Sequence, residues 1–266
     1  GELLNTFRDF IADRNAYYLV PNIILPLTQP KKLSFAELVG PVRLNYFVSH
    51  YWGTSFADFV STIKKHAEDT GVADWESLAY WICFLSNNQW QVADEVGAGD
   101  WQESSFYKAL RSGYCTATCM VVDQKALPLT RSWCLFEVLQ SYKLEAEGDG
   151  NGFQGLVFCS AAGIIGSGKC YDTDMALAKR LATLSVADAT ASNAEDQEMI
   201  TRLVEEEGGM ERMNRFIRDN MGRTLEAASS RFLEDVTKVR QGLAQQAETG
   251  SPENGTLPAK FAEVTL

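Results

Sequence analysis

Apolar segments alternate with amphipathic segments over the first two thirds of the chain, and this alternation predicts a doubly wound parallel sheet with helical crossovers. We expect strands at residues 44–49, 80–85, 115–122 and 153–159. Apolar residues recur at helical spacing between them, so we expect helices at residues 54–71, 103–112 and 130–144. The pattern therefore predicts an α/β domain.

The two ends of the chain differ in pattern from this central part. Residues 1–40 combine a short helical pattern with three prolines, and we expect them to pack on the α/β domain at residues 41–172. A helical extension is expected at residues 173–247, where apolar residues from Leu225 to Leu243 form one stripe. The remaining residues, 248–266, are rich in Gly, Pro, Ser and Asn and are expected to be mobile.

The net charge and the residue composition of the chain disfavour several classes of binding partner. The 266 residues carry a formal net charge of −11, which disfavours binding to nucleic acid and to anionic membrane surfaces. No apolar run is long enough to span a bilayer, and the chain does not start with a basic segment followed by an apolar one. Six cysteines, without a CxxC pair and with His50 and His66 as the only histidines, suggest reduced core cysteines and no metal site. We expect a cytoplasmic protein.

Polar residues follow the expected strands, where parallel sheets bind their ligands. Ser49 and His50 end the first strand, and Asn87 follows the second. His50 either contacts a ligand or ties its loop to backbone carbonyls, and Trp52 either stacks on a base or packs the loop. Asn87 is either a ligand-binding residue or a turn former.

The expected helix at residues 130–144 presents two kinds of face. Cys134, Leu135, Val138 and Leu139 share the core face, whereas Trp133, Glu137 and Gln140 share another. A carboxylate one turn from an indole suits a flat cationic ligand, because both groups stabilise positive charge. The alternative is a solvated glutamate beside a half-buried tryptophan.

This helix also carries a resemblance to a known family. Ser132-Trp133-Cys134-Leu135-x-Glu137 resembles the S-x-W-C-x-x-E signature of Toll/interleukin-receptor (TIR) domains, and Phe47-Val48-Ser49-His50 resembles the end of their first strand. The order and spacing of the two motifs also match, over about residues 42–160. The segment Ser49-His50-Tyr51-Trp52-Gly53 with Trp133 looks like a divergent TIR-like group from single-celled eukaryotes. The resemblance implies a flavodoxin-like sheet.

The resemblance also implies a function. Many TIR domains cleave NAD at the nicotinamide–ribose bond, releasing ADP-ribose or a cyclic form, and their catalytic glutamate corresponds to Glu137. NAD would be the substrate, with no further cofactor, and Ser49, His50, Trp52, Asn87 and Trp133 are candidate binding residues. Other TIR domains are adaptors without catalysis that self-associate, so a silent signalling module is the alternative.

Two further features bear on assembly and on nucleotide binding. Trp90 and Trp101 lie in a long polar loop and are candidate anchors for TIR-type self-association. The segment 163–169 matches the GxxxxGK pattern of a phosphate loop, which would favour an NTPase. Cys170 stands where that pattern needs Ser or Thr for magnesium, so a glycine-rich surface loop is the better interpretation.

Overall fold

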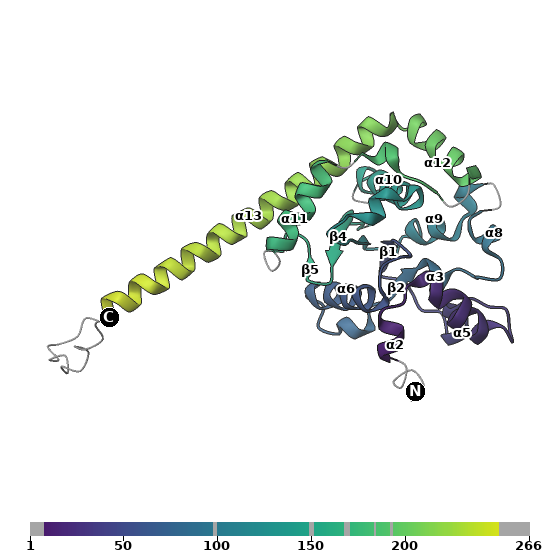
Figure 1. Ribbon diagram of the computed structural model, residues 1–266, viewed down its shortest axis with the longest axis horizontal. Coiled ribbons are helices and arrows are strands. Elements are labelled where there is room, and N and C mark those ends of the chain that lie inside the picture. Colours follow the sequence, from purple (N-terminus) through teal and green to yellow (C-terminus); the bar gives the residue numbers. More distant parts are fainter. Residues whose placement is uncertain are drawn as a thin grey trace, which may run out of the picture.

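The chain forms a five-stranded sheet surrounded by helices. The computed structural model describes residues 8–97, 100–148, 152–167, 171–183, 185–191 and 194–249. The strands are β1 (Tyr46–His50), β2 (Tyr80–Ile82), β3 (Ala117–Val121), β4 (Leu156–Ser160) and β5 (Gly163–Ile164). They lie in the order β2-β1-β3-β4-β5, with the first four parallel and β5 antiparallel to β4. This arrangement confirms the predicted α/β, flavodoxin-like fold (Figure 1).

Each face of the sheet carries its own core because side chains alternate along every strand. Phe47 and Met120 belong to the cluster that includes the apolar residues of α10 (Ser132–Ala146). Val48 and Val121 belong to a second cluster with Phe59 of α6 (Phe56–Asp69). The helices α6 and α10 therefore cover opposite faces, and Ser49 faces the α10 side.

The N-terminal residues pack on the α6 side. They form α2 (Arg8–Ala12), α3 (Ala16–Leu19), η1 (Val20–Ile24), α4 (Leu25–Thr28) and α5 (Phe35–Val39). Ile11 and Leu19 are buried in the same cluster as Val48. The backbone N–H of Ala16 donates to the carbonyl of Trp52 at 2.9 Å, which fastens this segment to the loop after β1.

The second strand is shorter than predicted. Residues 83–85 do not continue it, because the chain turns into α7 (Cys83–Ser86) after Ile82. The N–H of Ile82 donates to Ser86 Oγ at 3.1 Å, and among the described strands β2 pairs only with β1. A short edge strand that ends in a helical turn brings Cys83 and Asn87 beside the end of β1.

The segment that follows β2 is mostly structured. It contains α8 (Val92–Glu95), η3 (Trp101–Glu103) and α9 (Ser105–Leu110), while η2 (Trp75–Ser77) precedes β2. Trp90 Nε1 donates to Thr28 Oγ1 at 3.0 Å, and the Trp101 ring meets Phe136 edge to face at 5.1 Å. Both indoles, expected as anchors of self-association, therefore make contacts within the chain.

The helix α10 is more deeply buried than its sequence pattern predicted. Cys134, Leu135, Val138 and Leu139 are buried, as expected. Gln140, which was expected to share the other face with Trp133 and Glu137, is buried as well. The helix α12 (Ala194–Glu206) packs against α10 and contributes to the cover on this side.

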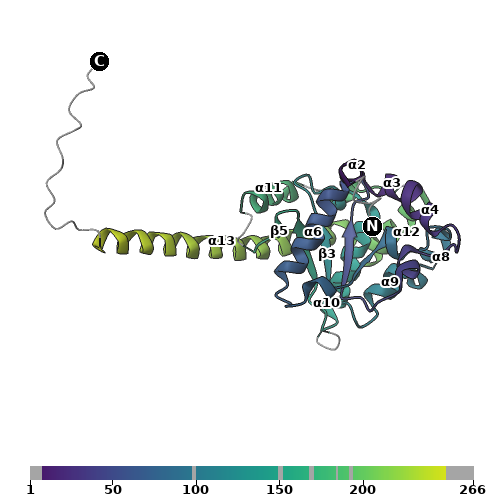
Figure 2. The same cartoon turned by 90° about the horizontal axis from the view of Figure 1, so that it is seen from below.

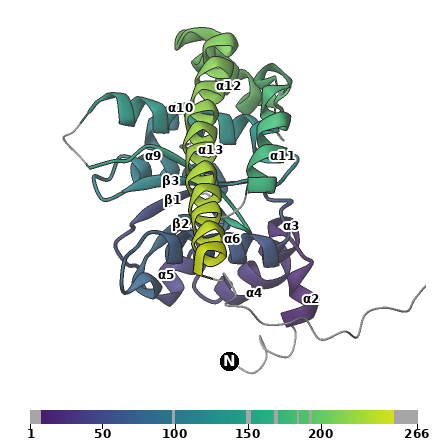
Figure 3. The ribbon, with the colours of Figure 1, turned by 90° about the vertical axis from the view of Figure 1, so that its left-hand side faces the viewer.

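The remaining helices are η4 (Leu127–Thr130), α11 (Tyr171–Ala182), η5 (Val186–Asp188) and α13 (Gly209–Thr249). The helix α11 packs along α13 (Figure 3), whose C-terminal half projects away from the domain (Figures 1 and 2). Within the described part of the chain, no helix combines the length and the apolar character required to cross a membrane. The prediction of a mobile tail falls on residues 248–266, and residues 250–266 lie outside the described part.

The described part of the segment 163–169, residues 163–167, does not form the strand and loop expected of a phosphate loop. Its first two residues form β5, and the N–H of Gly166 donates to the carboxylate of Asp174 at 3.2 Å. An acidic side chain thus occupies a loop amide that a phosphate would need. Residues 168–170, including Lys169, lie outside the described part of the chain.

Candidate functional site

A pocket of about 410 Å³ lies at the carboxyl ends of β1 and β2, where parallel sheets bind ligands. Its aromatic lining includes Trp52, Trp81 and Trp133. Charged residues also line it, and they are Glu95, Arg131, Glu137 and Asp196. Five of the six candidate site residues line this pocket. They are His50, Trp52, Asn87, Trp133 and Glu137.

Glu137 projects from α10 into this pocket and is otherwise surrounded by protein. Burial raises the pKa of Glu137 to about 8, and the hydroxyl of Ser49 offsets part of that rise. Ser49 Oγ is buried and forms no full hydrogen bond with the residues described. Glu137 is therefore half-buried in the pocket wall, in contrast to the fully solvated glutamate of the alternative.

A residue of α12, which is not part of the sheet, fixes the side chain of Trp133. Its Nε1 donates to the carboxylate of Asp196 at 2.9 Å, and this contact joins α10 to α12. The preceding residue is held in the same way, because Ser132 Oγ donates to Gln197 Oε1 at 2.7 Å. With its N–H engaged by Asp196, the indole of Trp133 has a defined orientation at the pocket wall.

Trp52 forms another wall. Its Nε1 donates to Cys83 Sγ at 3.1 Å, and its ring lies 5.5 Å from that of Tyr17 in a tilted arrangement. The side chain therefore packs the loop after β1 and lines the pocket at the same time. Packing and ligand contact, the two interpretations left open by the sequence, are compatible here.

His50 is buried beneath the pocket. Its ring lies 4.7 Å from Phe59 and 5.5 Å from Phe84, and its Nδ1 is 3.4 Å from the carbonyl oxygen of Tyr51. Burial lowers the pKa of His50 to about 4, so the imidazole is neutral near pH 7. These contacts favour a histidine that ties its loop over one that supplies positive charge to a ligand.

Asn87 and Asp123 have different roles. Asn87 lines the pocket, and its Oδ1 is buried and accepts no hydrogen bond from the residues described. Asp123 instead accepts from the N–H groups of Lys125 and Leu127, each at 3.1 Å, and so caps the loop after β3.

Several lining residues were not predicted as site residues. Trp81 stacks on Phe47 at 4.7 Å, and Arg131 places its guanidinium 5.9 Å from the centre of the Tyr51 ring. Glu95 accepts from the N–H of Asn88 at 2.9 Å and from the hydroxyl of Ser105. Arg131 directly precedes the motif of α10, and this adjacency is the one sequence signal that could have identified it.

Comparison with known proteins gives no relative for this chain: profiles of protein families, curated proteins and solved structures all yield no match. The fold is therefore established by the chain's own strand order and packing. The chemistry of the pocket rests on the arrangement of Glu137, the indoles and Arg131.

Proposed function

We propose that this protein cleaves NAD at the nicotinamide–ribose bond, as an NAD glycohydrolase or ADP-ribosyl cyclase, with Glu137 as the catalytic residue. The observation that carries the proposal is a desolvated carboxyl group in an indole-lined pocket at the carboxyl ends of the strands. The S-x-W-C-x-x-E resemblance supports the same residue. A cytosolic location, without nucleic-acid or membrane partners, belongs to this proposal.

The charges in the pocket suit the two ends of the substrate. Glu137 and the indoles of Trp52 and Trp133 favour a flat cation such as the nicotinamide ring of NAD. Arg131 lies in the same lining and would pair with the pyrophosphate. Asn87 also lines the pocket, and its amide would hydrogen-bond a ribose hydroxyl or the carboxamide of the substrate.

Ionisation of Glu137 is coupled to substrate binding. In the free protein much of this carboxyl group is neutral at pH 7, because its pKa is about 8. A pyridinium beside it stabilises the carboxylate and lowers that pKa. The bound substrate thereby creates the anion that the reaction needs.

The reaction requires little else from the protein. The bond between the nicotinamide nitrogen and the ribosyl carbon breaks, both electrons stay on nicotinamide, and it leaves as a neutral base. The ribosyl carbon becomes oxocarbenium-like, and the Glu137 carboxylate stabilises it more than the ground state. Water then adds to this carbon and loses a proton to give ADP-ribose, or an atom of the adenine adds to give a cyclic form.

The test is release of free nicotinamide from NAD by the purified protein over a range of protein concentrations. Glu137→Gln keeps the shape of the side chain and removes its charge, and we expect it to lose on the order of a hundredfold or more in rate. Glu145→Gln is the matched control, because Glu145 is exposed on the same helix. A wild-type protein that releases no nicotinamide contradicts the proposal.

The second candidate function is a signalling module that self-associates without catalysis, and α13 favours it. The helix runs from Gly209 to Thr249, and its C-terminal half projects from the domain (Figure 2). Val239 and Leu243 are 63% and 62% exposed there. Together with Phe232 and Val236 they follow spacings that alternate between four and three residues, the pattern of a coiled-coil seam.

Light scattering distinguishes this candidate. If α13 pairs with α13 of a second copy, Leu243→Glu should shift the protein from dimer to monomer. Gln241→Glu, which adds the same charge two residues away from the seam position, should leave the dimer intact. A monomeric wild-type protein at high concentration would eliminate self-association through α13.

A further inference from the structure

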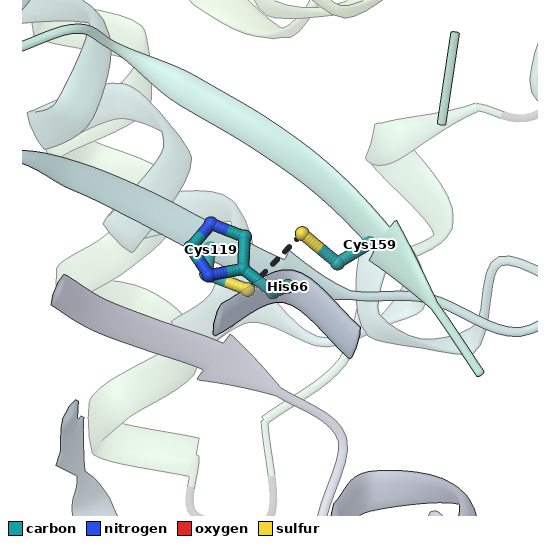
Figure 4. A group of neighbouring side chains, drawn as sticks. All are labelled: His66, Cys119 and Cys159. Carbon is teal, nitrogen blue, oxygen red and sulfur yellow. Dashed lines mark hydrogen bonds between the residues drawn. The ribbon is translucent and has the colours of Figure 1, made fainter. Parts of the chain in front are cut away.

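Three metal-ligating side chains meet on the face of the sheet opposite to Glu137. His66 comes from α6, Cys119 from β3 and Cys159 from β4 (Figure 4). One ligand atom of each lies within 4.8 Å of the others, and all three residues are buried. The fold therefore brings together three residues for which the sequence alone indicated no metal site.

We propose that His66, Cys119 and Cys159 bind one Zn²⁺ ion, which joins α6 to the two central strands. Two sulfurs and an imidazole nitrogen form a donor set that suits Zn²⁺ and other thiophilic ions, and not Mg²⁺ or Ca²⁺. The pocket that contains Glu137 has a separate lining, so the proposed cleavage of NAD does not use these three residues.

The spacing of the two sulfurs fits an ion after a small adjustment. Cys119 Sγ and Cys159 Sγ are 3.1 Å apart. Two thiolates bound to a tetrahedral Zn²⁺ at about 2.3 Å each lie roughly 3.8 Å apart. A change of well under 1 Å in one side-chain position therefore opens the space between them.

Two neighbouring side chains interact with the proposed ligands, one through a hydrogen bond and one through its charge. The hydroxyl of Tyr80 lies 2.8 Å from Nδ1 of His66 and fixes the orientation of the ring. Ligating histidines are commonly oriented by such outer contacts. The carboxylate of Asp69, one turn after His66 on α6, acts electrostatically on both His66 and Cys159.

A direct disulfide is the competing use of the two cysteines. Cys119 lies opposite Val157, and Cys159 lies opposite Val121, so the two cysteines are diagonal neighbours. Diagonal pairs are farther apart than opposite pairs, whereas a disulfide needs Cα atoms within about 7 Å. A disulfide would not involve His66, so the position of His66 beside the two cysteines favours an ion.

The test uses the full chain, stripped with a chelator, reduced, and titrated with Co²⁺ and then with Zn²⁺. We expect one equivalent of Co²⁺ to give thiolate charge-transfer bands and the visible bands of a tetrahedral site, and Zn²⁺ to displace it. Cys119→Ala and Cys159→Ala should each remove the charge-transfer bands or weaken Zn²⁺ binding at least tenfold. Cys115→Ala, at another buried cysteine, should leave both unchanged.

The wild-type protein alone also decides the matter if a variant fails to fold. One equivalent of Zn²⁺ should raise the Tm of the stripped, reduced protein, because the ion binds the folded state. Absence of Co²⁺ bands together with an unchanged Tm overturns the proposal. A loss of two hydrogens between Cys119 and Cys159 in air, without metal binding, identifies them instead as a redox pair.

Discussion

The burial of Glu137 predicts a particular dependence of stability on pH, which Glu137→Gln should remove. The pKa of this carboxyl group is about 8 in the folded protein, against an ordinary value of 4.5. Between these two pH values the folded state holds one more proton at this site than the unfolded state. The free energy of unfolding contributed by Glu137 is therefore fully present below pH 4.5 and decreases as pH rises to about 8.

The size of the effect follows from the same shift. A rise of about 3.5 pKa units corresponds to roughly 5 kcal/mol at full value. The side chain borders an open pocket, so solvent reduces this figure, and we expect about 3 kcal/mol. Glutamine cannot ionise and resembles the neutral carboxyl group in shape. The variant should match wild type near pH 4.5 and exceed its stability by about 3 kcal/mol at pH 8.5.

Urea unfolding followed by tryptophan fluorescence at several pH values between 5 and 8.5 measures this difference. His50 and His66 also affect stability, because burial lowers the pKa of each to about 4. Their contribution rises with pH between 4 and 6.5, but it is common to both proteins and cancels in the difference. Glu145→Gln should follow wild type throughout. A difference between Glu137→Gln and wild type that stays constant with pH would refute the burial of Glu137.

Three further predictions concern the proposed activity. The value of kcat/KM for NAD should fall about tenfold per pH unit below pH 8, because it reports the ionisation of Glu137 in the free protein. The value of kcat should stay constant to lower pH, because bound substrate lowers the pKa of Glu137. Initial rates from pH 5.5 to 9 check this, and identical pH profiles of kcat/KM and kcat would contradict it. Ser49→Ala removes the hydroxyl that lowers the pKa of Glu137, so the kcat/KM limb should move to higher pH, not lower. Trp133→Phe loses the hydrogen bond to Asp196, worth about 1 kcal/mol, and should raise KM roughly fivefold with little change in kcat; a loss of kcat as large as that of Glu137→Gln would show that Trp133 acts in the chemical step.

The sheet could be predicted from sequence because buried parallel strands are short apolar runs separated by amphipathic helices. All four predicted strands exist, and their order follows the expected topology. The end of β2 could not be placed, because residues 83–85 remain apolar in a buried helical turn. Hydrophobic periodicity does not distinguish a strand from such a turn over so few residues.

The site was predictable where its residues end a strand or share one motif. Glu137 and Trp133 lie within one motif on one helix. The desolvation of Glu137 depends on partners far along the chain, since α12 packs on α10 and Asp196 holds Trp133. The group of His66, Cys119 and Cys159 was missed for the same reason, because α6, β3 and β4 bring it together only in the folded chain.

The most direct test of the central claim separates binding of NAD from its cleavage in one variant. The dissociation constant of NAD and the rate of nicotinamide release under single-turnover conditions would be measured for wild type and Glu137→Gln at pH 8. A carboxylate that acts mainly on the oxocarbenium-like transition state predicts a loss of rate on the order of a hundredfold or more, with a much smaller change in the dissociation constant. Equal single-turnover rates in the two proteins would show that Glu137 is not the catalytic residue.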